Sequence, residues 1–178
     1  MDNILKKDLQ LTNYTLEKMK ELKDIFIYGD AVDDDSKRAG TISFNILGLD
    51  HGLVAAILND YFNIAVRNEC FCAHPYVEKM LHISHEEEIS NLDCIDNNLA
   101  WNIEPWMGMI RASFGLYTKE SDIDALINAL NDITENKEKF IKEYKLSKDG
   151  EYIHKTFNFS SKDFFSLTGT INQDILKK

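Results

Sequence analysis

The sequence predicts an α+β fold, with one small mixed or antiparallel sheet covered by helices on one face. Short runs with alternating polar and apolar residues, or with many β-branched residues, are interleaved with longer segments whose apolar residues recur at helical intervals. The 178 residues also suffice for one domain with an appendage, but they carry too few strand-like runs for a doubly wound sheet.

Helical spacing of apolar residues predicts the covering helices. Residues 3–22 place apolar side chains on one face among lysines and acids. A second helix follows Asp50, whose carboxylate suits an N-cap. A third begins near Thr118, where Asp122 adds an acidic group at the positive end of the helix dipole. A short helix is expected over residues 76–82.

Four runs predict strands. Residues 41–46 alternate polar and apolar side chains, as a half-buried strand does. The other predicted strands are 25–28, 63–67 and 109–117, and residues 148–151 are expected to form a hairpin turn.

The expected domain comprises residues 1–135, followed by a C-terminal extension over 136–178. A helical insertion is predicted at about 83–106, because apolar residues recur there at roughly helical intervals among acidic groups. In the extension the periodicity weakens and scattered aromatic residues stand among Ser, Thr and Lys. The insertion and the extension are therefore the candidates for contacts with a partner.

Charge and composition exclude several classes of protein. The net charge is −10 and the pI is about 4.9, which argues against nucleic-acid binding through a basic face. No apolar run is long enough to cross a bilayer, and the N-terminal residues lack the apolar core of a signal peptide. Three cysteines, Cys70, Cys72 and Cys94, do not form a paired set, so the cytoplasm is the expected compartment.

A thiol and a guanidinium suggest a reactive site. Cys72 lies in a loop over 67–75, and a thiol nucleophile needs an exposed position that favours the thiolate. Arg111 lies on a predicted strand, and arginine binds carboxylates through two parallel hydrogen bonds. From the residues alone, Cys72 could instead be a small buried apolar residue and Arg111 a salt-bridged surface residue.

A metal site at the same loop is the weaker interpretation. Sulfur and nitrogen ligands are offered by Cys70, Cys72, His74, His82 and His85. The C-x-C-x-H spacing at 70–74 differs from that of structural zinc sites. No metal is predicted.

Five stretches of the chain carry a resemblance to a known family. In chain order they are GTISFN at 40–45, AVRN at 65–68, CAHP at 72–75, IRASFGLYT at 110–118 and DIDAL at 122–126. Together they resemble the carboxy-terminal small domain of class V aminotransferases, and in particular the cysteine desulfurase and selenocysteine lyase branch. The resemblance extends over about residues 5–135.

The resemblance implies a homodimeric pyridoxal-phosphate enzyme of fold type I that removes sulfur or selenium from an amino acid, or performs a related transamination. The sulfur-accepting cysteine of the family, which carries a persulfide, falls on Cys72. The arginine that holds the substrate carboxylate falls on Arg111, and Arg67 matches a substrate-binding position near the site. These roles follow from the resemblance alone.

The chain also departs from the family pattern. Glu69, Cys70 and Phe71 stand where Gly and His are usual, and a nearby Glu raises a thiol pKa. The cofactor-binding large domain, with its cofactor-linked lysine, has no counterpart. We therefore expect that the chain alone neither binds pyridoxal phosphate nor turns over, and that its partner is its own N-terminal large domain. Two alternatives are a non-catalytic dimerisation or partner-binding module, and a transaminase-type domain whose cysteine is not catalytic.

Overall fold

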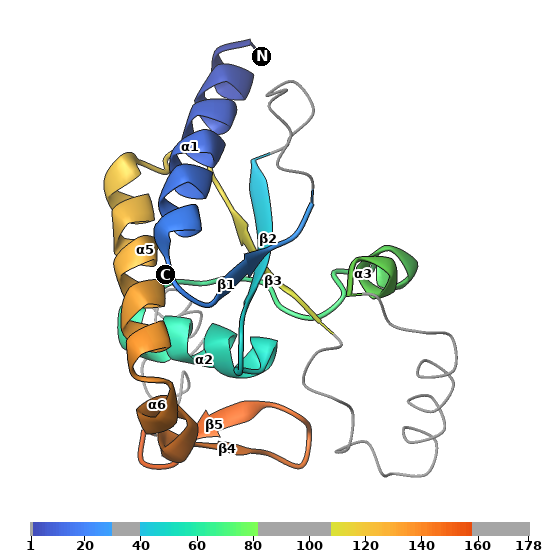
Figure 1. The fold of residues 1–178 in the computed structure, drawn as a ribbon, viewed down its shortest axis with the longest axis vertical. Helices are drawn as coiled ribbons and strands as arrows, with labels where there is room; N and C mark the ends of the chain where they lie inside the picture. The colour runs from blue at the N-terminus through green and yellow to red at the C-terminus, as the bar shows by residue number, and fades with distance from the viewer. Residues whose placement is uncertain (1, 30–39, 82–107, 158–178) are drawn as a thin grey trace, which may run out of the picture.

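The computed structural model describes residues 2–29, 40–81 and 108–157 (Figure 1). Within these ranges no helix has the length and apolar character needed to cross a membrane. The helices are α1 Asp2–Glu21, α2 His51–Phe62, α3 His74–Leu81, α5 Glu120–Glu135 and α6 Lys137–Glu143. The strands are β1 Ile25–Ile27, β2 Thr41–Ile46, β3 Ile110–Ser113, β4 Tyr144–Leu146 and β5 Tyr152–His154.

A three-stranded antiparallel sheet forms the centre of the fold, in the order β1-β2-β3. Phe44 lies opposite Ile27 on one side and Ile110 on the other, so the six-residue β2 is the middle strand. A separate antiparallel pair, β4-β5, lies below the sheet in Figure 1. The α+β class predicted from the sequence is confirmed.

One face of the sheet builds the hydrophobic core. Alternate strand residues, namely Ile42, Phe44 and Ile46, are at most 1% exposed, because successive side chains of a strand point to opposite faces. They belong to one cluster with the buried stripes of α1, α2 and α5. All three helices therefore cover the same face of the sheet.

Local signals set the ends of α2. The Asp50 carboxylate accepts hydrogen bonds from the backbone N–H groups of Gly52 and Leu53, at 2.7 and 3.2 Å, as predicted for an N-cap. At the other end Asn63 adopts a left-handed conformation with φ 55°, which asparagine tolerates better than most residues. The chain then turns towards the edge of the sheet.

Two strand predictions are wrong in extent. Residues 63–67 do not form a strand, because Asn63 serves as the C-cap of α2 and only Arg67 makes a bridge to β3. The strand predicted over 109–117 ends at Ser113, because Gly115 and Thr118 close a turn in which Thr118 N–H donates to Gly115 O at 3.0 Å.

Two further predictions, a short helix and a hairpin turn, are confirmed. The short helix predicted over 76–82 is α3, which begins at His74. The hairpin turn predicted over 148–151 joins β4 to β5, where Ser147 N–H donates to Glu151 O at 2.8 Å. The helical insertion predicted at about 83–106 lies outside the described residues, and the division at residue 135 stays a prediction.

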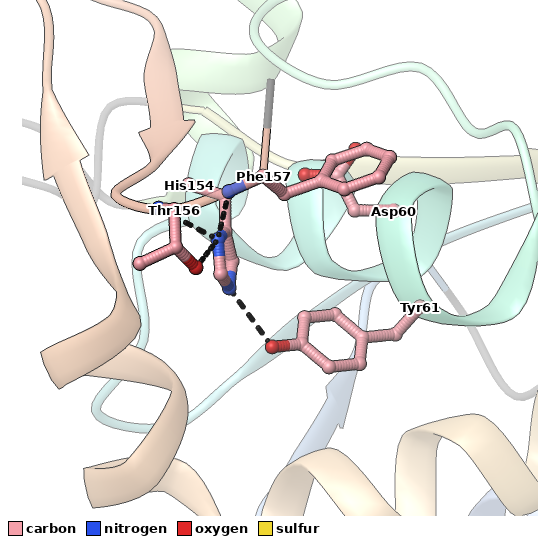
Figure 2. A pocket seen from close by; sticks show the side chains of 5 residues that line it. All are labelled: Asp60, Tyr61, His154, Thr156 and Phe157. Carbon is pink, nitrogen blue, oxygen red and sulfur yellow. Dashed lines mark hydrogen bonds between the residues drawn. The ribbon is translucent and has the colours of Figure 1, made fainter. Parts of the chain in front are cut away.

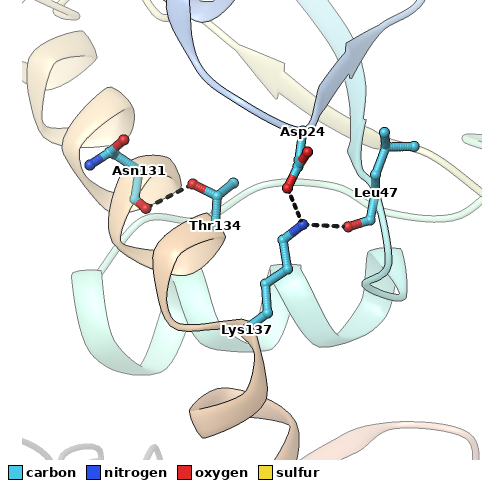
Figure 3. A network of polar contacts seen from close by, with 5 residues as sticks. All are labelled: Asp24, Leu47, Asn131, Thr134 and Lys137. Atoms are coloured by element: carbon cyan, nitrogen blue, oxygen red, sulfur yellow. Dashed lines mark hydrogen bonds and ion pairs between the residues drawn. The ribbon is translucent and has the colours of Figure 1, made fainter.

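The segment after residue 135 packs on the same core as the helices before it. Phe140 and Tyr144 are 1% and 4% exposed and belong to the main hydrophobic cluster. At the start of α6, Lys137 Nζ donates to Asp24 Oδ2 and to the carbonyl of Leu47, both at 2.7 Å (Figure 3). This lysine joins α6 to the turns before β1 and after β2, and its hydrogen bond lowers the pKa of Asp24.

The hairpin β4-β5 is anchored to α2 by a polar and aromatic cluster. His154 Nδ1 accepts the backbone N–H of Phe157 at 2.9 Å, so its Nε2 carries the proton and donates to Tyr61 Oη at 2.9 Å (Figure 2). Tyr61 donates to Glu143 at 2.6 Å, and this bond is the main cause that raises the Tyr61 pKa to about 12. A hollow of about 310 Å³ lies beside His154, but Asp60, Tyr61 and His154, which line it, already form hydrogen bonds within the protein.

Candidate functional site

The face of the sheet opposite the helices carries a row of polar side chains, which we call the open face. Tyr28 N–H donates to Ser43 O at 2.9 Å, Ser43 lies opposite Arg111 in the sheet register, and Arg111 forms a bridge with Arg67. Directly opposed residues on neighbouring strands project to the same face. The row therefore crosses four segments of the chain.

A buried asparagine holds this face together. Asn45 is 7% exposed, and its Nδ2 donates to Gly108 O at 2.9 Å and to Tyr28 Oη at 3.1 Å. Its Oδ1 accepts the N–H of Ile110 at 3.3 Å. Burial raises the pKa of Tyr28 although the bond from Asn45 acts in the opposite direction, so Tyr28 stays a neutral phenol. The amide thereby fixes β1 and the start of β3 relative to β2.

The two predicted arginines lie directly opposite each other. Arg67 N–H donates to Arg111 O at 3.1 Å, and Arg111 N–H donates to Arg67 O at 2.7 Å. Like charges in such a pair destabilise a sheet unless an anion lies between them. Within the described ranges neither guanidinium forms an ion pair with an acid, and the buried Nε of Arg111 has no hydrogen-bond partner. This arrangement is suited to an incoming carboxylate.

The cysteine loop continues from this pair along the edge of β3. Met109 N–H donates to Glu69 O at 3.1 Å, which keeps residues 67–69 aligned with the strand. The chain then makes a tight turn in which Ala73 N–H donates to Cys70 O at 2.8 Å. The two central residues, Phe71 and Cys72, have φ 54° and 63°. These are the angles of a turn that Asn and Gly usually occupy.

The turn separates its two thiols. Cys72 is exposed, as a nucleophile requires, whereas Cys70 is half-buried. Burial is the main cause that raises the pKa of Cys70, and the carboxylates of Glu78 and Glu69 add to it. The effect predicted for a neighbouring glutamate therefore acts on Cys70, which makes this thiol a poorer nucleophile near neutral pH.

Phe71 connects the turn to the arginine pair. The guanidinium carbon of Arg111 lies 5.0 Å from the centroid of the Phe71 ring, which is a cation–π distance. The residue next to Cys72 in the chain is thus in contact with the arginine whose side chain lies on the open face.

A half-buried histidine lies next to the loop. His51 is the first residue of α2, and its Nδ1 lies 3.4 Å from the side-chain nitrogen of Asn68. Burial lowers the pKa of His51, against the opposing effect of Asp50 and Glu69, so the ring is neutral near pH 7. A Cβ at Gly108 would clash with the His51 ring and lie 2.8 Å from the Glu69 backbone, so only glycine fits here.

The open face does not by itself fit pyridoxal phosphate. That cofactor requires a lysine for covalent attachment, and β1, β2, β3 and the segment 63–73 contain none. The face offers two cations, and the turn that carries the exposed thiol of Cys72 contacts one of them through Phe71. In the described part of the chain no cluster of three His, Cys, Asp or Glu could hold a metal ion.

The structure brings Arg67 and Arg111 together and places the Cys72 turn beside them; their roles stay predictions. Tyr28, Ser43 and Asn45 were not singled out from the sequence. The alternation in TISFNI contained the signal for Ser43 and Asn45, because polar residues between buried apolar ones must face the other side of the sheet.

Comparison with known proteins gives consistent similarities. Residues 1–126 match the sequence profile of the family described as Aminotransferase class-V. A probable cysteine desulfurase of Staphylococcus aureus is 33% identical over 135 residues, which cover 75% of this chain and 26% of that protein. A molybdenum cofactor sulfurase of Bombyx mori is 31% identical over 135 residues, which cover 71% of this chain and 16% of that protein.

A solved structure agrees with these matches. The apo structure of a cysteine desulfurase from Thermococcus onnurineus NA1 aligns with a TM-score of 0.55 and 28% identity, covering 74% of this chain and 26% of that chain. The present chain thus spans about a quarter or less of the length of these relatives.

Proposed function

The chain belongs to the class V aminotransferase family, and we propose that it is the C-terminal small domain of a cysteine desulfurase-like or selenocysteine lyase-like enzyme. In this proposal Arg111 and Arg67 bind the carboxylate of the amino-acid substrate, and Cys72 accepts the sulfur. The similarity to a probable cysteine desulfurase and to a molybdenum cofactor sulfurase supports a sulfur-transferring branch.

The observation that carries the proposal is the opposed pair Arg67 and Arg111. Two cations in direct register without an acidic partner in the described ranges repel each other. A substrate carboxylate that accepts hydrogen bonds from both guanidinium groups removes that cost, since bidentate, charge-assisted hydrogen bonds are among the strongest available. The pair is therefore better suited to binding an anion than to stabilising the sheet.

The cofactor belongs to another part of the proposed enzyme. When bound, pyridoxal phosphate withdraws electron density from the substrate's α-carbon and so makes its bonds easier to break. Because the open face has no lysine, we propose that the cofactor and its lysine reside on a large domain outside this chain. The complete enzyme would be a homodimer in the cytoplasm, and this chain alone would be inactive.

Within this scheme the chain's own residues have separate tasks. Arg111, with Arg67 beside it, holds the substrate through its carboxylate and so fixes the direction of its side chain. Cys72, as the thiolate, attacks the substrate sulfur and keeps it as a persulfide, while the carbon skeleton retains the electron pair of the broken carbon–sulfur bond and takes up a proton. If the substrate is free cysteine, the product released would be alanine.

The test is expression of this chain in one polypeptide with the sequence encoded upstream of it. The expected product is a yellow protein that forms alanine from cysteine. Arg111→Lys keeps the charge but loses the two-pronged geometry, so it is expected to raise KM for cysteine by at least tenfold. A colourless protein without alanine formation would refute the proposal.

A second variant separates the catalytic alternatives. Cys72→Ser should abolish sulfur transfer, and Cys70→Ser should retain it because Cys70 is half-buried. Full activity of Cys72→Ser would instead indicate a transaminase-type or cysteine-independent enzyme. The non-catalytic module would be indicated if the joined protein binds its partner but never pyridoxal phosphate.

A further inference from the structure

We propose that Phe71 is a positioning residue that couples the carboxylate-binding Arg111 to the thiol of Cys72. The inference rests on the proposed function, and it assigns a role to a residue for which the sequence motifs indicate none.

The first observation is the contact itself. The Phe71 ring lies 5.0 Å from the guanidinium carbon of Arg111. An aromatic ring attracts a cation through its face and leaves the N–H donors, which lie in the plane of the guanidinium, available. A carboxylate partner would orient the arginine equally well but would occupy those donors. Phe71 therefore orients Arg111 while keeping its donors available for a substrate.

The second observation is the backbone of the turn. Phe71 and Cys72 both have positive φ, and a 2.8 Å hydrogen bond from Ala73 N–H to Cys70 O closes the turn. Left-handed conformations are unfavourable for residues with a side chain, above all for a bulky one. Something outside the turn must therefore hold it, and the stacking of Phe71 on Arg111 is a contact that can do so.

These two observations together link the two reactive groups. Arg111 is fixed on β3 by its paired hydrogen bonds with Arg67, so it is the rigid partner in the contact. Phe71 fixes the turn against this partner, and Cys72 is the next residue along the chain. Removal of the ring is expected to release the turn and to separate the exposed thiol from the positive charge of Arg111.

The experiment measures this separation without enzymatic turnover. In the Cys70→Ser form of the chain, the alkylation rate of Cys72 is measured with iodoacetate and with neutral iodoacetamide, and the modified peptide is quantified by mass spectrometry. The rate with iodoacetate, an anion, is divided by the rate with iodoacetamide. A positive charge near the thiol raises this ratio, whereas a change in the exposure of the thiol alters both rates alike. In the parent protein Arg111 should raise this ratio, and added salt should lower it.

Matched variants separate the ring from the backbone. Phe71→Gly suits the left-handed turn but removes the ring, and Phe71→Leu keeps an apolar side chain. Both are expected to lower the ratio by roughly threefold, because that is the effect on the rate of an attraction between two opposite unit charges several ångströms apart in water. Phe71→Tyr keeps the ring and should retain the ratio. Removal of the exposed ring of Tyr76 by Tyr76→Ala is the control, which should also retain it.

Arg111→Gln makes the two proposals distinguishable. It should lower the ratio as Phe71→Gly does, and the double variant should show no further decrease. If Arg111→Gln lowers the ratio but Phe71→Gly and Phe71→Leu do not, the role of Phe71 is refuted while the substrate-binding proposal stands. If Arg111→Gln has no effect, the coupling is refuted, and alanine formation by the joined protein still tests the function separately. Should Phe71→Gly fail to fold by circular dichroism, Phe71→Leu decides.

Discussion

The two faces of the central sheet are built from the same strands and differ in almost every property. On one face Ile42, Phe44 and Ile46 are buried against three helices. On the other face Ser43 and Asn45 alternate with them and lie near the two arginines. The core face stabilises the fold through apolar burial, whereas the open face keeps two cations opposed without an acidic partner in the described ranges. The comparison indicates that alternate residues of one sheet build the core on one face and leave the other face available for the proposed substrate binding.

The largest expected effect is on the core face. Phe44→Ala removes a fully buried ring from the middle strand and should lower the free energy of unfolding by about 3–5 kcal/mol. Urea unfolding followed by circular dichroism measures this change. A loss below 1 kcal/mol would contradict the assignment of this face as the core.

A smaller loss of stability is expected at the polar residue that holds the open face together. Asn45→Leu leaves Gly108 O, Ile110 N–H and Tyr28 Oη without their partner and should cost about 1–3 kcal/mol. Ser43→Ala on the same face is the control, with an expected change within about 0.5 kcal/mol. Equal effects of the two variants would show that Asn45 does not organise this face.

Replacing one arginine of the pair should affect activity and leave stability almost unchanged. Arg111→Met removes one of two like charges and a buried Nε without a hydrogen-bond partner. The free energy of unfolding of the chain should therefore change by no more than about 0.5 kcal/mol, or rise. The same substitution should abolish alanine formation by the joined protein. A large loss of stability would mean that Arg111 is a structural residue.

The pH dependence of stability should report on His51. Burial lowers its pKa in the folded state below the ordinary value of 6.5. The unfolded chain therefore binds more protons than the folded chain between the two pKa values, so stability falls as the pH drops below about 6.5. His51→Gln should reduce this slope when unfolding is measured at pH 7 and pH 5.5, whereas His154→Gln serves as a histidine control elsewhere in the fold. An unchanged slope in His51→Gln would contradict the half-buried, neutral ring.

The sequence predicted the core face better than the open face, for a physical reason. Alternation in residues 41–46 and helical periodicity are local, so they correctly indicated β2, α1, α2 and α5. The run 63–67 has strand-like composition, but Asn63 adopts a left-handed conformation and the run became an edge segment with one bridge. Tertiary context outweighed propensity there.

The candidate site was predictable only in part. Cys72, Arg67 and Arg111 could be selected from their chemistry and from the family resemblance. The stacking of Phe71 on Arg111 joins residues 40 positions apart in the chain, and no spacing rule connects them. The same holds for Asn45 and Gly108, whose hydrogen bond depends on how β2 and the start of β3 align.

The most direct test of the open face as a substrate-binding and sulfur-accepting surface is mass spectrometry of the joined protein after incubation with cysteine. We expect the peptide with Cys72 to gain the mass of one sulfur atom, and we expect this gain to disappear in Arg111→Met, a variant that should remain folded. Sulfur transfer that persists in Arg111→Met, or that appears on a residue other than Cys72, would contradict the account.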